Sequence, residues 1–299
     1  MVNSRQVRSL TDFPPEIMEY IFEQLGPENS SHQDVDLCTE TLRSSLFVSR
    51  YYRAFALPRL FQSIRVHVQN KGSESSLPRL DLLLSILCPS SLHVQWMSIL
   101  PFVRNFELTL WCPYDTDSEP YLPRLLSILS GDQSHQLKSL DLSLQACRSL
   151  DCRHFTKAFQ DAVVHLLKMP KVQSVKIAGA GFLSLDFLRS THIRQLDVLS
   201  YDPQAYPYSR SPDEEKRGNS RLRSLSTDSS FPFRVETPEA ESLLEGLDHL
   251  SIDINDNCEH IYAKVANILR FTTTLKTLTP SYGEHYGELD LVVYVHHDR

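Results

Sequence analysis

Apolar residues recur along most of the chain in one short phrase, apolar-x-x-apolar-x-apolar. Apolar and polar residues that alternate with a period of two are typical of a β-strand with one buried face. Successive copies begin 21 to 35 residues apart, which indicates a solenoid of repeated strand units. Seven copies occupy residues 103–108, 137–142, 172–177, 193–198, 222–227, 247–252 and 275–280, and a degenerate earlier member occupies residues 63–68.

Positions inside each phrase are expected to point in different directions. The first, fourth and sixth residues face the core, whereas the third, fifth and seventh face the open side of the sheet. Cations recur at the second position, where we interpret them as a solvated edge rather than a phosphate site: Arg104, Lys138, Arg194, Arg223 and Lys276. The open face is polar and mildly acidic, with Glu107, Asp141, Lys176, Asp197, Ser226, Ser251 and Thr279 at the fifth position and Thr109, Ser143 and Asp253 at the seventh.

This open face is the first candidate binding surface. We interpret it as a recognition surface for a somewhat basic protein segment. The alternative is that its residues are solvated strand positions, since an exposed sheet face must be polar in any case. The candidate binding residues of this face are Glu107, Asp141, Lys176, Asp197 and Asp253.

Stretches between the phrases have the period of amphipathic helices. Strand followed by helix, repeated, predicts an α/β fold in which a curved parallel sheet carries helices on its outer side. A proline-, charge- and tyrosine-rich stretch at residues 200–221 is predicted to be an exposed insertion loop, and an apolar run at 289–297 a closing strand. Helices are expected at residues 80–87, 94–100, 121–129, 155–167, 183–188, 240–244 and 261–271.

The first sixty residues have a helical pattern instead. Ile17, Ile21 and Leu25 recur at i, i+4 and i+8 with Met18 and Phe22 beside them, so this first helix has an apolar flank to bury. Thr11 or Asp12 is expected to supply its N-cap oxygen, and Pro14 and Pro15 to occupy its first turn. Gly26 and Pro27 are expected to end it.

Two more helices are expected in this region. One spans residues 39–48 after a polar loop at 27–36, with Leu42, Leu46 and Val48 buried. The other spans residues 50–57, is capped by Ser49 and ends before Pro58. Three such short helices can hardly bury enough apolar surface alone, so the bundle needs a partner or the rest of the chain.

These residues resemble the F-box. Its pattern of Leu-Pro-x-Glu-Ile/Leu, then Ile-Phe and Leu, is matched by the run from Phe13 to Ile17 followed by Ile21, Phe22 and Leu25. Its later pattern, Leu-x-Val-Cys/Ser-Lys/Arg-x-Trp/Phe-Arg, is matched by residues 46–53. The sequence departs from the family with Phe13 in place of leucine, Tyr52 in place of the commoner tryptophan, and a longer loop between the first two helices.

The resemblance implies a docking function. Residues 1–61 would be the F-box, which binds a Skp-type adaptor and through it a cullin ubiquitin ligase. Residues 62–299 would be an irregular leucine-rich-repeat-like domain that selects the client. The alternative is a scaffold outside any ligase, whose N-terminal helices pack on its own repeats. The residues that the resemblance assigns to the adaptor interface or its support are Phe13, Pro14, Glu16, Ile17, Ile21, Leu46, Val48, Arg50 and Tyr52.

Composition narrows the class of protein. A net charge of −7 and a pI near 5.9 argue against a nucleic-acid-binding surface, which needs a concentrated basic patch. No apolar run is long enough for a membrane span and the N-terminus lacks a signal-peptide core, so we expect a cytoplasmic or nuclear protein without a membrane partner. The six cysteines are interpreted as reduced thiols.

Motifs for catalysis or metal binding are missing from the sequence. Cys147 and Cys152 lack the second pair that a zinc site needs. Gly179 and Gly181 follow a strand phrase, but Ser184 stands where a dinucleotide fingerprint has its third glycine. We therefore expect a protein that is not an enzyme and that uses no cofactor and no metal.

Overall fold

The chain folds as an α/β protein with an open, mostly parallel sheet, and its described residues form two separate hydrophobic cores. The computed structural model describes residues 14–26, 35–68, 77–88, 98–110, 120–131, 136–144, 155–179, 191–199, 222–228, 244, 246–254, 266, 269–270, 272, 274–282 and 293–294. The strands are β1 (Ser63–Val68), β2 (Asn105–Leu110), β3 (Ser139–Ser143), β4 (Ser174–Ala178), β5 (Gln195–Leu199), β6 (Ser224–Asp228), β7 (His249–Ile254), β8 (Thr277–Tyr282) and β9 (Val293–Tyr294).

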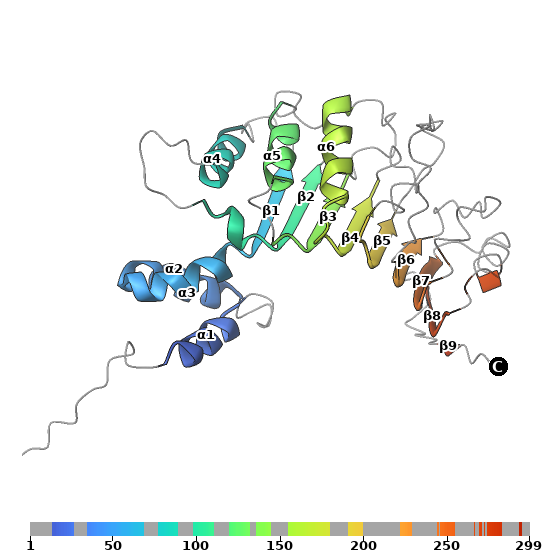
Figure 1. Cartoon of the computed structure of the whole chain (residues 1–299), viewed down its shortest axis with the longest axis horizontal. Helices are drawn as coiled ribbons and strands as arrows, with labels where there is room; N and C mark the ends of the chain where they lie inside the picture. Colours follow the sequence, from blue (N-terminus) through green and yellow to red (C-terminus); the bar gives the residue numbers. More distant parts are fainter. Residues whose placement is uncertain are drawn as a thin grey trace, which may run out of the picture.

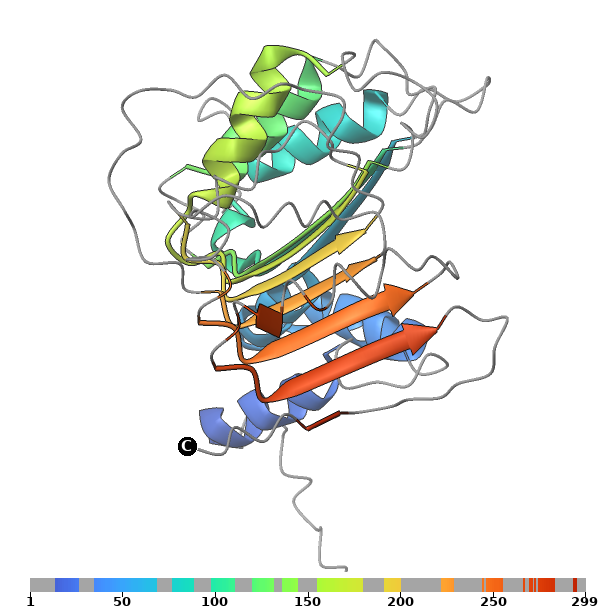
Figure 2. The same ribbon diagram turned by 90° about the vertical axis from the view of Figure 1, so that its right-hand side faces the viewer.

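The strands lie side by side in the order of the sequence, β1 to β9. Strands β1 to β8 are parallel, and β9 pairs antiparallel with β8. All eight repeated phrases are therefore confirmed as strands, and the predicted closing strand is confirmed at Val293–Tyr294. Figures 1 and 2 show the row of arrows, which bends into an arc.

Burial follows the predicted positions within the phrase. The first, fourth and sixth residues of the second copy, Val103, Phe106 and Leu108, are almost completely buried, and the corresponding residues of β3, β4 and β5 are buried as well. The register aligns each position with the same position of its neighbours, so that Glu107 is level with Asp141. The core consequently forms continuous apolar rows across the strands.

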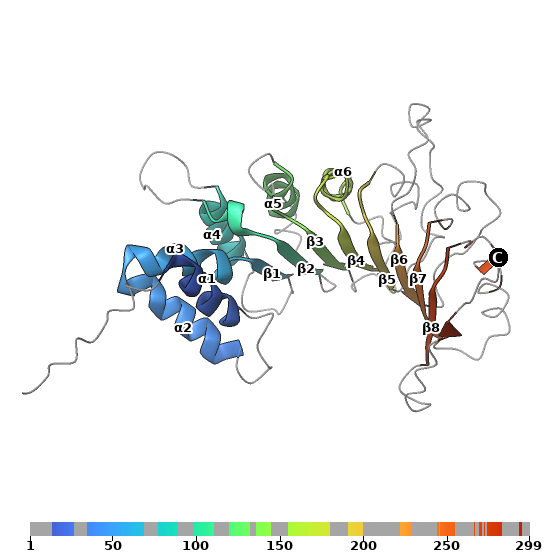
Figure 3. The ribbon, with the colours of Figure 1, turned by 60° about the horizontal axis from the view of Figure 1, so that its bottom comes forward.

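Helices α4 (Leu77–Leu87), α5 (Tyr121–Leu129) and α6 (Lys157–Leu167) cover the convex side of the sheet, as Figures 1 and 3 show. Each turns an apolar stripe toward the strands, for example Leu122, Leu125 and Leu129 of α5. None of the helices in the described part of the chain is both long and apolar enough to cross a bilayer.

Only residues 98–100 of the helix expected at 94–100 are described, and they are not α-helical; three other expected helices fall largely outside the described residues. Ser98 and Ile99 are not helical, and a short 3-10 helix, η2 (Leu100–Phe102), stands where the helix at 94–100 was expected to end. Because Pro101 follows Leu100, the chain turns there instead of continuing an α-helix. The helices expected at 183–188, 240–244 and 261–271, and the insertion loop at 200–221, lie wholly or mostly outside the described residues.

Three helices form a bundle beside β1, as Figures 1 and 3 show: α1 (Pro15–Gln24), α2 (Val35–Val48) and α3 (Arg50–Leu60). Helix α3 packs against both α1 and α2. The bundle has a small core of its own, made of Met18, Phe22, Leu42 and Ala56.

The ends of these helices differ from the expected ones. The N-cap of α1 is Pro14, which has no capping side chain, and its carbonyl accepts the N–H groups of Ile17 and Met18. Helix α2 begins at Val35 rather than at 39. The expected loop therefore ends earlier, and the sequence pattern missed the added turn because Leu37 is exposed and breaks the apolar period.

Helix α3 confirms one expected end and contradicts the other. The Oγ of Ser49 accepts the N–H of Tyr52 at 3.2 Å, as an N-cap does. The helix does not stop before Pro58 but continues to Leu60. A proline in the last turn removes only one hydrogen bond near the end of the helix. Leu60 packs against the bundle core. Val48, expected to be buried, is exposed, because it ends α2 where the chain turns into α3.

Candidate functional site

The first candidate binding surface in the described part of the chain is the outward side of α1, where large apolar side chains are exposed. Met18 and Phe22 are 2% and 3% exposed, whereas Ile17 and Ile21 are 45% and 39% exposed. Tyr20 joins them, and at the end of α2 Phe47 and Val48 are also exposed. Large apolar side chains left in water on a small bundle mark a surface suited to contact another polypeptide.

The inner side of α1 is held by aromatic packing. The ring of Phe22 stacks on that of Phe55, with centroids 5.8 Å apart, and lies 6.2 Å from the ring of Tyr52. Glu23 and Arg59 add an ion pair from α1 to α3 at 3.8 Å. These contacts fix which side of α1 faces the bundle, so Ile17 and Ile21 cannot turn inward without breaking them.

The residues expected at an adaptor interface fall into three groups. Phe13 lies outside the described residues. Leu46 and Tyr52 are half-buried against the bundle core and can support an interface but offer little surface to it. The remaining six are all exposed: Pro14, Glu16, Ile17, Ile21, Val48 and Arg50.

The bundle and the sheet do not share a core in the described part of the chain. The cluster around Met18 and Phe22 contains residues of α1, α2 and α3 only. The sheet core begins with Phe61 and Ile64. Contact between the two units comes from the end of the bundle, where α3 meets η2. Thus the outward side of α1 is left uncovered by the described strands.

The second candidate site is the fifth-position row on the open face of the sheet. The register places Arg65, Glu107, Asp141, Lys176 and Asp197 next to one another on β1 to β5. The Nε of Arg65 lies 3.1 Å from Oε2 of Glu107, and the Nζ of Lys176 lies 3.8 Å from Oδ2 of Asp141. Opposite charges on adjacent strands attract, so this row is partly neutralised by itself.

Asp141 is a partly buried carboxylate of this row. Burial raises its pKa above the usual value; Lys176 opposes the rise, while Glu107 and Asp197 add to it. Because the net shift is upward, the cost of burying the charge together with the repulsion from two acids exceeds the attraction of one lysine. A further cation brought by a partner would therefore be favoured beside Asp141.

The fifth predicted client residue lies apart from the other four. Asp253 is on β7, level with Asp228 of β6 and Ser281 of β8. It is two strands away from Asp197 and two residues further along its strand. The fifth-position row, called the acidic row below, therefore brings together Glu107, Asp141, Lys176 and Asp197, and Asp253 lies outside it.

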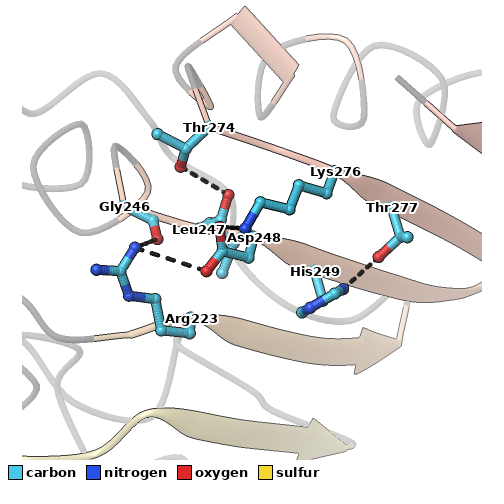
Figure 4. A network of polar contacts seen from close by, with 8 residues as sticks. All are labelled: Arg223, Gly246, Leu247, Asp248, His249, Thr274, Lys276 and Thr277. Atoms are coloured by element: carbon cyan, nitrogen blue, oxygen red, sulfur yellow. Dashed lines mark hydrogen bonds and ion pairs between the residues drawn. The ribbon is translucent and has the colours of Figure 1, made fainter. Parts of the chain in front are cut away.

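The second-position cations form the edge at which the strands begin. From Arg104 to Asp248, each second-position carbonyl accepts N–H groups from the next repeat, as that of Arg104 does from Lys138 at 2.7 Å. In the β7 repeat the second position is an acid, Asp248. Asp248 lies 3.6 Å from Nη1 of Arg223 and 3.1 Å from Nζ of Lys276, and Figure 4 shows this network. In the same network His249 bonds Thr277 on β8.

Sequence reasoning missed some of these residues. Tyr20 and Phe47 were not assigned to the interface because the motif pattern does not require apolar residues there, although each is a bulky residue next to a motif position. Arg65 does not stand at the fifth position when the degenerate earliest phrase is read from residue 63. Read from Phe61, which packs against the sheet core, Arg65 is its fifth residue.

Within the described residues no three His, Cys, Asp or Glu side chains gather closely enough to hold a metal ion. No family model matches this chain, and no curated protein is found to be similar to it.

Proposed function

We propose that this protein is the substrate-recognition subunit of an SCF-type cullin ubiquitin ligase. In this proposal the α1–α3 bundle is an F-box that docks on a Skp-type adaptor, and the leucine-rich-repeat-like sheet unit binds the client protein. The protein then acts by bringing two partners together and not as an enzyme.

One observation carries the proposal: Ile17 and Ile21 are exposed although Met18 and Phe22, on the same helix, are buried. A bundle that served only to stabilise this chain would turn its largest apolar residues inward or onto the sheet. Exposed isoleucines one helical turn apart instead form an anchor for a partner helix or groove. They are also two of the positions that resemble the F-box pattern.

The position of the bundle supports separate adaptor-binding and client-binding units. Its core is separate from that of the sheet in the described residues, so an adaptor can cover α1 without disturbing the strands. The open face of the sheet stays available to a second protein, since the described helices α4, α5 and α6 lie on the other side.

The test is capture of a purified Skp-type adaptor by the full-length protein. Ile17→Glu with Ile21→Glu should abolish capture, because two charges would be placed at the centre of the interface. The control is Leu82→Glu with Ile86→Glu, an exposed apolar pair at the same spacing on α4, which should leave capture intact. Thermal unfolding of both variants shows that they remain folded.

Failure of the unmodified protein to capture the adaptor contradicts the proposal, as does equal loss in both double variants. In that event the protein is better described as a scaffold that recruits no ligase. A cullin pulled down together with the adaptor would extend the result to the complete ligase.

A further inference from the structure

The second-position edge of the sheet differs between its two halves. Toward the C-terminus, Arg223 and Lys276 share the carboxylate of Asp248. Toward the N-terminus, Arg104 of the β2 repeat, Lys138 of the β3 repeat and Arg194 of the β5 repeat are exposed, and no described acidic side chain pairs with them. Among the described residues, Asp248 partly neutralises the C-terminal half of the edge, whereas the N-terminal half carries three cations without an acidic partner.

These three cations occupy adjacent places along one line. Backbone hydrogen bonds run from Lys138 N to Arg104 O, from Gln173 N to Lys138 O and from Arg194 N to Gln173 O. The row thus advances one strand at a time, with exposed, uncharged Gln173 between the second and third cation. Three strand spacings place the Arg104 and Arg194 backbones about 14 Å apart. We call Arg104, Lys138 and Arg194 the basic edge.

The basic edge runs parallel to the acidic row. The fifth-position residues lie three residues further along each strand, about 10 Å away. Between the two lie uncharged third-position residues. They are Asn105, Ser139, Ser174 and Gln195.

We propose that the basic edge binds an extended acidic segment of a client protein. This inference rests on the proposed function, since it names the chemistry of the client that the sheet recognises. About 14 Å corresponds to roughly five residues of extended chain. Glutamate or aspartate side chains of that segment pair with Arg104, Lys138 and Arg194, while basic side chains beside them reach toward Asp141 and Glu107.

The acidic row favours an acidic peptide over a nucleic acid as the ligand of the basic edge. A nucleic acid carries charge of one sign along its whole backbone and is attracted by a broad basic surface. Here Glu107, Asp141 and Asp197 lie within about 10 Å of the cations, and the chain has a net charge of −7. A peptide can vary the sign of its charge from residue to residue and thus match both bands.

The experiment measures fluorescence anisotropy of a labelled penta-glutamate peptide with the full-length protein at low salt. The test variant is Arg104→Gln with Lys138→Gln. The matched control is Arg124→Gln with Lys157→Gln, which removes two exposed cations from α5 and α6 on the other side of the sheet. We expect at least about fivefold weaker binding in the test variant, because each exposed ion pair contributes up to about 1 kcal/mol. The control should bind as the unmodified protein does.

Three outcomes overturn the inference: no binding of the peptide, equal losses in both variants, or tighter binding of a single-stranded oligonucleotide of the same charge. Adaptor capture by the test variant is measured in parallel. Capture retained while the peptide fails to bind rejects only this inference. If the peptide binds through the basic edge but the protein captures no adaptor, the result supports the proposed role of the basic edge and rejects the ligase function.

Discussion

Leu60 and Phe61 are adjacent in the chain, yet their side chains belong to different cores. Leu60 packs against the bundle cluster of Met18 and Phe22, whereas Phe61 packs against the sheet cluster. The N–H of Phe61 donates to the carbonyl of Leu57 at 3.1 Å and so closes the end of α3. The change from one core to the other therefore takes place within one peptide bond at the end of α3, and a substitution on the outward side of α1 should leave the sheet intact.

Pro14→Ala combined with Ile17→Ala should weaken adaptor binding by about 2 to 4 kcal/mol, as truncation of central anchors does. Thermal unfolding of the sheet unit should not change, because neither side chain reaches its core. Calorimetric titration with the purified adaptor measures the loss. The control, Pro78→Ala with Leu82→Ala on α4, should bind normally, and an equal loss there would contradict a specific role for α1.

Leu140→Ala should lower the free energy of unfolding by about 2 to 5 kcal/mol, since Leu140 is buried in the centre of the sheet core. Urea denaturation provides the measurement. Leu82→Ala, at an exposed position, should change the same quantity by less than about 0.5 kcal/mol. Equal effects would mean that the sheet does not bury Leu140.

Asp248→Asn should destabilise the protein by roughly 0.5 to 2 kcal/mol, because the carboxylate forms ion pairs with Arg223 and Lys276 on the two adjacent repeats. The loss should shrink at high salt, which screens exposed charges. Denaturation at two ionic strengths tests both statements. Asp81→Asn, an exposed carboxylate on α4, is the control, and a salt-independent loss at Asp248 would argue against an electrostatic origin.

Asp141→Asn should stabilise the protein at neutral pH. Burial raises the pKa of Asp141, Glu107 and Asp197 add to the rise, and Lys176 opposes it. The folded protein therefore favours the protonated carboxyl. The stability that this provides is complete below the unfolded pKa of about 3.8 and is lost as pH rises through the folded pKa. The gain from asparagine should therefore vanish in acid. Stability measured against pH checks this, and Lys176→Met should raise the pKa of Asp141 further, as carboxyl NMR titration would show.

Charge reversal by Asp141→Lys and Asp197→Lys should weaken client capture by at least about fivefold if the acidic row contacts a basic part of the client. A quantitative pull-down from cell extract, compared with the adaptor signal from the same sample, measures the effect. Asp81→Lys with Asp161→Lys places the same charge change on α4 and α6. Unchanged client capture by the row variant would remove this surface from consideration.

The strands were predictable because their information is local. A strand buries alternate residues, so the positions of Leu140, Leu142 and Leu144 alone indicate which side faces the core, and all three are buried. The same alternation placed Asp141 on the open face. The failures lie where burial does not follow the period, as at exposed Leu37, or where a proline is tolerated late in a helix, as at Pro58.

The candidate sites were predictable only in part. A motif can select Ile17 and Ile21, but Tyr20 and Phe47 become part of the exposed surface only when the packing of α1 and α2 on α3 is known. Similarly, the phrase indicates that Asp253 points outward, yet its distance along the sheet from Asp197 follows from the order and register of the strands.

The amino-acid sequence by itself determined the repeat, the inward and outward positions of each strand and the existence of three N-terminal helices, because each depends on a period within a few residues. The tertiary structure decided which side of α1 is left in water and which charges from distant repeats become neighbours. It also decided that Asp248 partly neutralises the C-terminal half of the edge, while no described acid pairs with the cations of the other half. Those properties depend on contacts between residues far apart in the chain, which no local pattern contains.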